Sequence, residues 1–305
     1  MAKWSGIYPI LYAFWDEQGR LDEAVMRRQV EHCIATGAHG IAVLGLVTEV
    51  HKMDINERLH LVEMVGDMIA GRVPYAVTVG EPSLAGQIAF SKAAANAGAN
   101  WVILQPPAIK GTSQSDLIDF FGQVAEAVDI DVAVQNNPVN LDVSLSIDGL
   151  VALHKAHPNI SILKGEGFSV DIAQVIESSG GAYQVFGGHG GIEFPALLRS
   201  GGAGLIPAPD FLAPQVALYE LWRSGRVAEA EAIHRKILPA IVFMSRSVPA
   251  MLCYGKRLFA QQIGVTTIND RTPALQPTLF GLNETAQFAS DIELAASVVS
   301  ADAAE

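Results

Sequence analysis

A lysine at the end of a short apolar segment is the residue best suited to covalent chemistry in this sequence. Residues 159–165, Asn-Ile-Ser-Ile-Leu-Lys-Gly, predict a buried strand. Side chains alternate along a strand, so Lys164 shares a face with Ile160 and Ile162. Burial among apolar groups disfavours an ammonium ion and leaves a neutral amine that can attack a carbonyl carbon. On this segment alone, a lysine that reaches solvent beyond the turn is the better interpretation.

Glu166 is the titratable residue nearest to Lys164 in the sequence. If the chain stays extended, the two side chains point the same way, and Glu166 could carry protons for the lysine. A structural ion pair with Lys164, or an N-cap for the next helix, explains the same residue equally well. These interpretations stay open at the level of the sequence.

The overall composition excludes several classes of protein. The chain has 305 residues, of which 50% are hydrophobic, enough for one large α/β domain with or without an appendage. Its formal net charge of −12 argues against a nucleic-acid partner, because phosphate binding requires a basic surface. Neither the two cysteines, Cys33 and Cys253, nor any spacing of histidine and acidic residues predicts a metal site.

No apolar segment reaches the roughly 20 residues that span a bilayer. The first six residues, Met-Ala-Lys-Trp-Ser-Gly, lack the apolar run of a signal peptide. We therefore expect a cytoplasmic protein without a membrane partner.

The elements that position Lys164 follow a regular alternation. Apolar strand-like segments occupy residues 8–14, 40–44, 74–79, 101–105, 130–135, 159–164, 183–186 and 203–207. An amphipathic segment of helical period follows each of them. Eight such units predict a parallel sheet closed into a (β/α)₈ TIM barrel, which usually takes about 250 residues. An open doubly wound sheet is the alternative, but no Gly-x-Gly-x-x-Gly turn follows the first strand.

The pattern changes after residue 224. Residues 226–244, 249–263 and 284–299 have helical periodicity without intervening strands. We therefore predict two domains, a barrel over residues 1–224 and a C-terminal helical domain over residues 225–305.

The active site of such a barrel lies at the carboxyl ends of its strands. The residues that end the eight segments are Tyr12, residues 45–49, Thr78, Gln105, residues 135–137, Lys164 with Glu166, residues 187–189, and Pro207 with Asp210. Lys164 is the only lysine among them, which favours its role as a nucleophile. His51 and His189 lie in or near these loops, where a lone histidine more often faces solvent than substrate.

Several collinear motifs resemble one known superfamily. They are residues 6–10 (Gly-Ile-Tyr-Pro-Ile), 16–22, 45–49 (Gly-Leu-Val-Thr-Glu), 57–58, 106–107 (Pro-Pro), 135–138 (Gln-Asn-Asn-Pro), 162–164 (Ile-Leu-Lys) and 204–206. Together they resemble the dihydrodipicolinate synthase / N-acetylneuraminate lyase superfamily over nearly the whole chain. The resemblance implies a (β/α)₈ barrel that assembles as a dimer or tetramer.

The resemblance also implies a reaction. Lys164 would condense with the keto group of pyruvate or another 2-oxo acid, which would be the small-molecule partner. The protonated imine withdraws electrons from the neighbouring carbon and stabilises a carbanion as an enamine. This chemistry requires no metal and no organic cofactor, so we expect none.

The sequence departs from the superfamily pattern at the reacting centre. Leu46-Val47 replaces the Thr-Thr pair that binds the carboxylate, and Gln135 replaces the catalytic tyrosine. The second tyrosine, expected after Pro106-Pro107, is absent. Asn140 occupies the place of the arginine that binds the aldehyde substrate of dihydrodipicolinate synthases. Loss of these groups argues against that particular activity.

The predicted site follows from these matches and departures. The predicted catalytic residues are Lys164, Glu166 and Gln135, and the predicted substrate-binding residues are Leu46, Val47, Thr48, Asn136, Gly188 and Tyr12. The Lys-x-Glu pattern with Gln-Asn-x-Pro resembles the branch that contains 2-keto-3-deoxy-L-arabonate dehydratase. We therefore expect a lyase that dehydrates a 3-deoxy-2-oxo sugar acid.

Four alternatives stay open. They are aldol cleavage of such an acid, condensation of pyruvate with an aldehyde, a less polar or aromatic substrate that fits the apolar Leu46-Val47 loop, and a barrel that binds 2-oxo acids without turnover.

Overall fold

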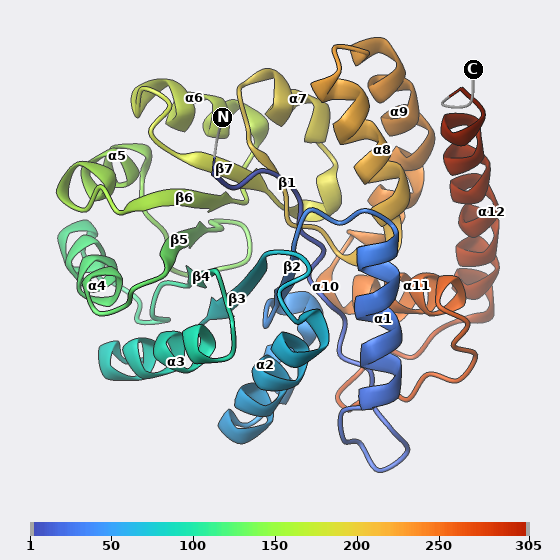
Figure 1. Cartoon of the computed structure of the whole chain (residues 1–305), viewed down its shortest axis with the longest axis horizontal. Helices are drawn as coiled ribbons and strands as arrows, with labels where there is room; N and C mark the ends of the chain where they lie inside the picture. Colours follow the sequence, from blue (N-terminus) through green and yellow to red (C-terminus); the bar gives the residue numbers. More distant parts are fainter. Residues whose placement is uncertain (1–2, 303–305) are drawn as a thin grey trace.

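The protein is a (β/α)₈ barrel with additional C-terminal helices. The computed structural model describes residues 3–302, with side chains through residue 290 and at residue 292; Met1 and Ala2, at the start of the segment considered for a signal peptide, lie outside the described residues. The strands are β1 (Gly6–Ile7), β2 (Ile41–Val43), β3 (Tyr75–Val79), β4 (Trp101–Leu104), β5 (Asp131–Asn136), β6 (Ile160–Gly165), β7 (Gln184–Gly187) and β8 (Gly204–Leu205). They pair in parallel in the order β1-β8-β7-β6-β5-β4-β3-β2, and the helices surround them (Figure 1).

The barrel closes between β2 and the segment that follows β1. Ile10 forms a parallel bridge with Ala42, and the Leu11 N–H donates to the Ala42 carbonyl at 2.9 Å. The sequence predicted a strand over residues 8–14, but β1 covers only Gly6–Ile7. Residues 8–14 are buried without forming a regular strand, although the Tyr8 and Ile10 N–H groups still donate to the Leu205 and Pro207 carbonyls; Pro9 has no N–H group to donate. The expected barrel is confirmed, but the predicted position of the first strand is wrong, because β1 lies just before residues 8–14.

Eight helices follow the eight strands as expected. They are α1 (Glu23–Ala35), α2 (Ile55–Ile69), α3 (Leu84–Asn96), α4 (Gln114–Glu126), α5 (Ile147–Ala156), α6 (Ser169–Ser178), α7 (Phe194–Arg199) and α8 (Leu212–Arg223). Asp54 and Glu57 form the predicted capping box at the start of α2. Ser83, Ser113 and Ser146 cap the helices that follow them, which fixes where each helix begins.

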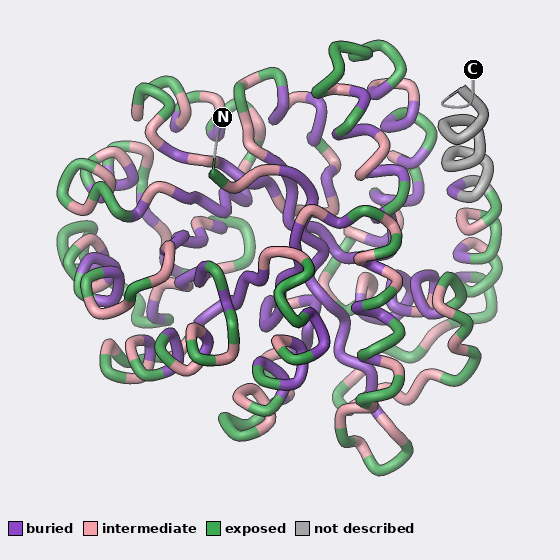
Figure 2. Tube along the Cα trace, viewed as in Figure 1, coloured by how far each residue is buried: buried purple, intermediate pink, exposed green. Residues whose placement is uncertain are grey.

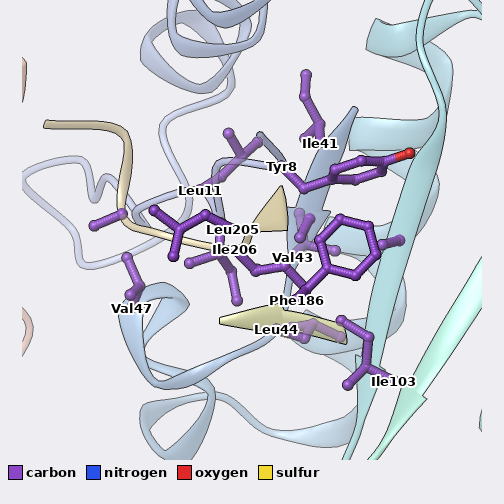
Figure 3. Close-up of a cluster of buried hydrophobic side chains, with 14 of the residues drawn as sticks. Tyr8, Leu11, Ile41, Val43, Leu44, Val47, Ile103, Phe186, Leu205 and Ile206 are labelled. Carbon is purple, nitrogen blue, oxygen red and sulfur yellow. The ribbon is translucent and has the colours of Figure 1, made fainter. Parts of the chain in front are cut away.

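An aromatic cluster fills part of the barrel interior. The ring of Tyr8 lies 5.3 Å from that of Phe186 and 5.4 Å from that of Trp101, in edge-to-face contacts. Figure 3 shows Tyr8 and Phe186 among aliphatic side chains from β2, β4 and β8. Lys164 on β6 is the register partner of Phe186 on β7, so both side chains point into the barrel. Burial follows the strands and the inner faces of the helices (Figure 2).

The C-terminal helices lie against one side of the barrel. They are α9 (Val227–Met244), α10 (Val248–Ala250), α11 (Lys256–Gln262) and α12 (Leu279–Asp302), and a π-helical turn, Met251–Gly255, joins α10 to α11. Helix α9 packs on α8, and α12 packs on α9 (Figure 1). The division into domains at residues 224 and 225 stays a prediction.

Among the described residues, no single helix is long and apolar enough to cross a membrane. Helix α9 and the helical segment Val248–Gln262 reach that length and composition only as a pair, and the pair is bent by 106°.

Candidate active site

A cavity of about 550 Å³ lies at the carboxyl ends of the barrel strands. Lys164 and Glu166, from β6 and the turn after it, line this cavity. Leu46 and Val47, after β2, and the glycine-rich segment 187–191, after β7, line it as well. The cavity therefore occupies the place where a barrel of this type carries its chemistry.

Lys164 and Glu166 form a buried pair. The Lys164 Nζ lies 3.5 Å from the Glu166 Oε2, and their side chains are 6% and 10% exposed. The Glu166 N–H donates to the Asn136 carbonyl at 2.9 Å, which continues the β5–β6 ladder and keeps Glu166 on the face of Lys164. A Cβ atom on Gly188 would lie 2.3 Å from the Glu166 Oε1, so a glycine at this position allows the carboxylate to fit.

Two amide side chains hold the Glu166 carboxylate. The Gln135 Nε2 and the Asn137 Nδ2, the latter at 2.9 Å, both donate to Glu166 Oε2. The Gln105 Nε2 donates to the Gln135 Oε1 at 2.9 Å, which directs the NH₂ group of Gln135 toward Glu166. Gln135 therefore orients the carboxylate that stands beside the lysine.

Asn137 is a member of this group that sequence reasoning did not select. It is fully buried, and its Oδ1 accepts a hydrogen bond from the Asn140 N–H at 3.0 Å. Its place before Pro138 in the Gln-Asn-Asn-Pro motif was visible in the sequence, but only the fold shows that it contacts Glu166. Asn140, which occupies the place of an arginine in the superfamily pattern, lines the cavity.

The loop after β2 contributes Leu46 and Val47 to the cavity lining but no hydroxyl group. Residues Leu46–Thr48 form a 3₁₀ turn, in which the N–H groups of Leu46 and Val47 have no acceptor within the turn. The Thr48 hydroxyl donates to the Leu11 carbonyl at 2.8 Å and accepts from the Leu44 N–H at 3.0 Å. Thr48 therefore braces the loop from within the core and does not line the cavity.

Asn136 and Tyr12, both predicted to bind substrate, lie outside the cavity lining. The Asn136 amide donates to the Leu145 carbonyl at 3.0 Å and accepts from the Leu145 N–H at 2.8 Å, which fixes the loop after β5. Tyr12 is fully buried and its hydroxyl lies near the Asp210 carboxyl and Gly255. Burial raises the pKa of the Tyr12 hydroxyl well above its usual value and raises the pKa of Asp210 to about 7.

A second buried pair lies behind the loop after β2. The Lys256 Nζ, on α11, donates to the Glu49 Oε1, and the Lys52 Nζ lies 2.6 Å from the Glu49 Oε2. Burial alone would raise the pKa of the Glu49 carboxyl, but the two ammonium groups outweigh burial and hold that pKa below its usual value. This pair attaches the C-terminal helices to the loop that carries Leu46 and Val47.

Sequence reasoning also missed the part of the cavity that the C-terminal helices supply. Ser245, Arg246 and Ser247, between α9 and α10, line the cavity together with Val248 and Met251. No strand-end argument could select them, because they come from outside the barrel.

Within residues 3–302, no group of three or more His, Cys, Asp or Glu residues is arranged to hold a metal ion. The expectation of no metal and no cofactor stays a prediction.

The model of the Dihydrodipicolinate synthetase family matches residues 3–287, and the chain belongs to this family. A protein of Escherichia coli (strain K12), named a probable 2-dehydro-3-deoxy-D-pentonate aldolase, is 28% identical over 84% of this chain and 87% of its own length. A protein of Emericella nidulans, named a probable mitochondrial 4-hydroxy-2-oxoglutarate aldolase, is 32% identical over 75% of this chain and 76% of its own length.

A similar solved structure is a prophage protein of the dihydrodipicolinic acid synthase family from Escherichia coli K12, in complex with pyruvate. It superposes with a TM-score of 0.89 over 96% of this chain and 100% of that chain, at 24% identity. The predicted family and fold are confirmed, and the protein is a lysine-dependent lyase of 2-oxo acids.

Proposed function

We propose that Lys164 is the imine-forming nucleophile and that Glu166 is the group that moves protons beside it. The observation that carries the proposal is the buried Lys164–Glu166 pair at the wall of a cavity, at 3.5 Å. Glu166 supplies a titratable group where Gln135 replaces the tyrosine of the superfamily pattern. An amide cannot exchange protons near neutral pH, so Gln135 acts by holding Glu166.

The first half of the reaction forms the imine. The Lys164 amine attacks the C2 keto carbon of the substrate, and the resulting carbinolamine loses water to give a protonated imine. The N–H groups of Leu46 and Val47 bind the substrate carboxylate, since their side chains offer no hydroxyl. Gly188, which has no side chain, lets the Glu166 carboxylate lie at the wall of the cavity beside Lys164.

The second half breaks a bond at C3 or C4. Glu166 accepts a proton from C3, and the electron pair of that C–H bond forms the enamine. In a dehydration, the enamine expels the C4 hydroxyl, which leaves as water with the proton that Glu166 returns. Tautomerisation and hydrolysis of the remaining imine then release the dioxo acid and the free Lys164 amine. In an aldol cleavage, a base takes the proton of the C4 hydroxyl instead, and the C3–C4 bond breaks.

We favour dehydration of a 3-deoxy-2-oxo sugar acid over aldol cleavage. The carboxylic acid form of Glu166 can protonate a leaving hydroxyl, and the Lys-x-Glu pattern supports this role. The two relatives with aldolase names support a substrate with CH₂ at C3 and a hydroxyl at C4, which both reactions require. Asn140, in place of an arginine, and Gln135, in place of the catalytic tyrosine, argue against dihydrodipicolinate synthase activity.

A product assay on racemic 3-deoxy-2-oxo pentonates and hexonates tests the proposal. Release of pyruvate, coupled to lactate dehydrogenase, reports cleavage, and the dioxo acid detected by mass spectrometry reports dehydration. We expect the dioxo acid, and we expect Glu166→Gln to form it about 10²–10⁴-fold more slowly, while Glu193→Gln, which changes the other acidic residue of the cavity lining, forms it at a rate close to that of the unmodified chain. Pyruvate as the main product would replace dehydration by aldol cleavage, and turnover unaffected by Glu166→Gln would overturn the role of Glu166.

We further propose a homo-oligomer, a dimer or a tetramer, in the cytoplasm. The family resemblance supports the oligomer, and light scattering of the purified chain tests it, with a monomeric mass as the contrary result.

A further inference from the structure

We propose that Arg246 binds a second carboxylate, so that the site selects 2-oxo acids with an anionic group at the end remote from the keto acid. This inference rests on the proposed imine chemistry of Lys164 and narrows the proposed substrate class to 3-deoxy-2-oxo acids that carry a second carboxylate at the far end. Its basis is the distribution of charge around the cavity.

The cavity lining includes one lysine, Lys164, and one arginine, Arg246, and only the lysine has an ion-pair partner among the described residues. Lys164 has Glu166 at 3.5 Å. Arg246 lies between α9 and α10. It has no hydrogen-bond or ion-pair partner among the described residues. An unpaired guanidinium that lines an enzyme cavity is available to an anion in the ligand.

The second acidic residue of the wall is already engaged elsewhere. The Glu193 carboxylate accepts hydrogen bonds from the Ser169 N–H at 2.9 Å and from the Ser169 Oγ at 3.1 Å, at the start of α6. It therefore holds the first turn of α6 and does not neutralise Arg246. A ligand anion near Arg246 would supply the negative charge that neither Glu166 nor Glu193 provides to this guanidinium.

The backbone around Arg246 is held in place on both sides. Ser245 ends α9, and Ser247 caps α10, where its Oγ accepts from the Ala250 N–H at 3.2 Å. A Cβ on Gly190 would lie 2.7 Å from the Ser245 Oγ, so the end of α9 packs directly on the glycine-rich loop after β7. The backbone that carries Arg246 is therefore held in place beside the catalytic cavity.

Much of the remaining cavity lining is apolar. It includes Leu46, Val47, Ile192, Val248 and Met251. These side chains can neither donate hydrogen bonds to a carboxylate nor replace a guanidinium, so the second anion has one cationic partner. A carboxylate can accept two parallel N–H bonds from a guanidinium, which makes a 2-oxo dicarboxylate the class of ligand that satisfies both ends.

Matched pairs of acids test the inference through the adduct on Lys164. The full chain is incubated with 2-oxoglutarate or 2-oxopentanoate, and with 2-oxoadipate or 2-oxohexanoate, then reduced with borohydride. Intact-mass spectrometry gives the concentration of each acid that labels half of the protein. The two members of each pair differ only in the terminal carboxylate, and the two lengths bracket the reach of the arginine.

We expect the dicarboxylate to label at a concentration about tenfold lower or more in at least one pair, as for a hydrogen-bonded charge pair. Arg246→Met should abolish this preference and leave labelling by pyruvate unchanged, and Arg246→Lys should keep part of it. Arg28→Met, an exposed arginine of α1 outside the cavity, is the control and should keep all of it.

Two results would overturn the inference alone: equal labelling within both pairs, or a preference that survives in Arg246→Met. Absence of any adduct, with pyruvate included, would overturn the proposed function and this inference with it.

Discussion

This molecule contains two buried lysine–glutamate pairs. One lines the catalytic cavity, and the other lies behind the loop after β2. Lys164 and Glu166 line the cavity of about 550 Å³ and lie 3.5 Å apart. Lys256 and Glu49 form a closer contact, with side chains 1% and 2% exposed, and Lys52 binds the other carboxylate oxygen. Lys256 lines neither this cavity nor the neighbouring one of about 330 Å³.

The difference shows what separates a reactive pair from a structural one. The Glu49 carboxylate is neutralised by two ammonium groups, so its position depends on them. The Glu166 carboxylate is held by the amides of Gln135 and Asn137, and Lys164 is its one ion-pair partner among the residues that the structure describes. Amides fix a carboxylate without adding charge, and the Lys164 side chain lines a cavity in which a ligand can bind.

Replacement of each lysine should distinguish the two pairs most clearly. Lys164→Met removes the nucleophile, and we expect kcat/KM to fall by at least about 10⁴-fold, the scale seen when a covalent nucleophile is lost. Lys256→Met should lower kcat/KM of the folded protein far less. Steady-state kinetics on protein with a native circular dichroism spectrum gives both values. Equal losses in the two variants would contradict the assignment.

The two glutamates should differ in the same direction. Glu166→Gln keeps the amide contacts but cannot move a proton, and we expect kcat to fall by about 10²–10⁴-fold, the usual contribution of a general acid or base. The borohydride adduct should still form, more slowly. Glu49→Gln should change the free energy of unfolding instead of the rate. Stopped-flow and denaturation measurements on both variants separate these effects, and a fast Glu166→Gln enzyme would assign that residue a purely structural role.

Stability should depend on the second pair. Lys256→Met leaves Glu49 buried beside Lys52 alone, and loss of one partner of a buried pair costs about 3–5 kcal/mol. Urea denaturation followed by fluorescence measures this free energy of unfolding. A loss below about 1 kcal/mol would show that Lys52 alone suffices for Glu49 and would weaken the contrast between the pairs.

Asp210 sharpens the contrast further, because it is a buried carboxyl without a cation. Burial raises its pKa from 3.8 to about 7, a difference of about 3 that corresponds to about 4 kcal/mol at most. The folded state therefore holds a proton that the unfolded state releases, and stability falls as the pH rises from about 4 to about 7. Asp210→Asn should remove this fall. Denaturation at pH 5 and pH 8 measures it, and identical slopes in both proteins would contradict the assignment.

The sequence predicted most of the fold because hydrophobic periodicity and helix caps are local signals. The capping box of Asp54 and Glu57 and the strand that ends at Lys164 follow from a few adjacent residues. The position of β1 could not be predicted in this way, because β1 pairs with β8, which lies about 200 residues later in the chain.

The site residues at strand ends whose side chains face the barrel interior could be predicted. Residues whose contacts depend on tertiary packing could not. Lys164, Glu166 and Gln135 meet as their strand positions require. Asn136 and Asn137 are neighbours in the sequence, but Asn136 binds Leu145 and Asn137 binds Glu166, since successive side chains point to opposite faces. Arg246 comes from the C-terminal helices, and only tertiary packing brings it to the cavity.

The central claim is that Lys164, and not the equally buried Lys256, forms the imine. The direct measurement is borohydride reduction in the presence of pyruvate, followed by peptide mass mapping of the unmodified chain, Lys164→Met and Lys256→Met. We predict one adduct per chain on the peptide that contains Lys164, lost in Lys164→Met and retained in Lys256→Met. An adduct on another lysine, or none on Lys164, would contradict the account.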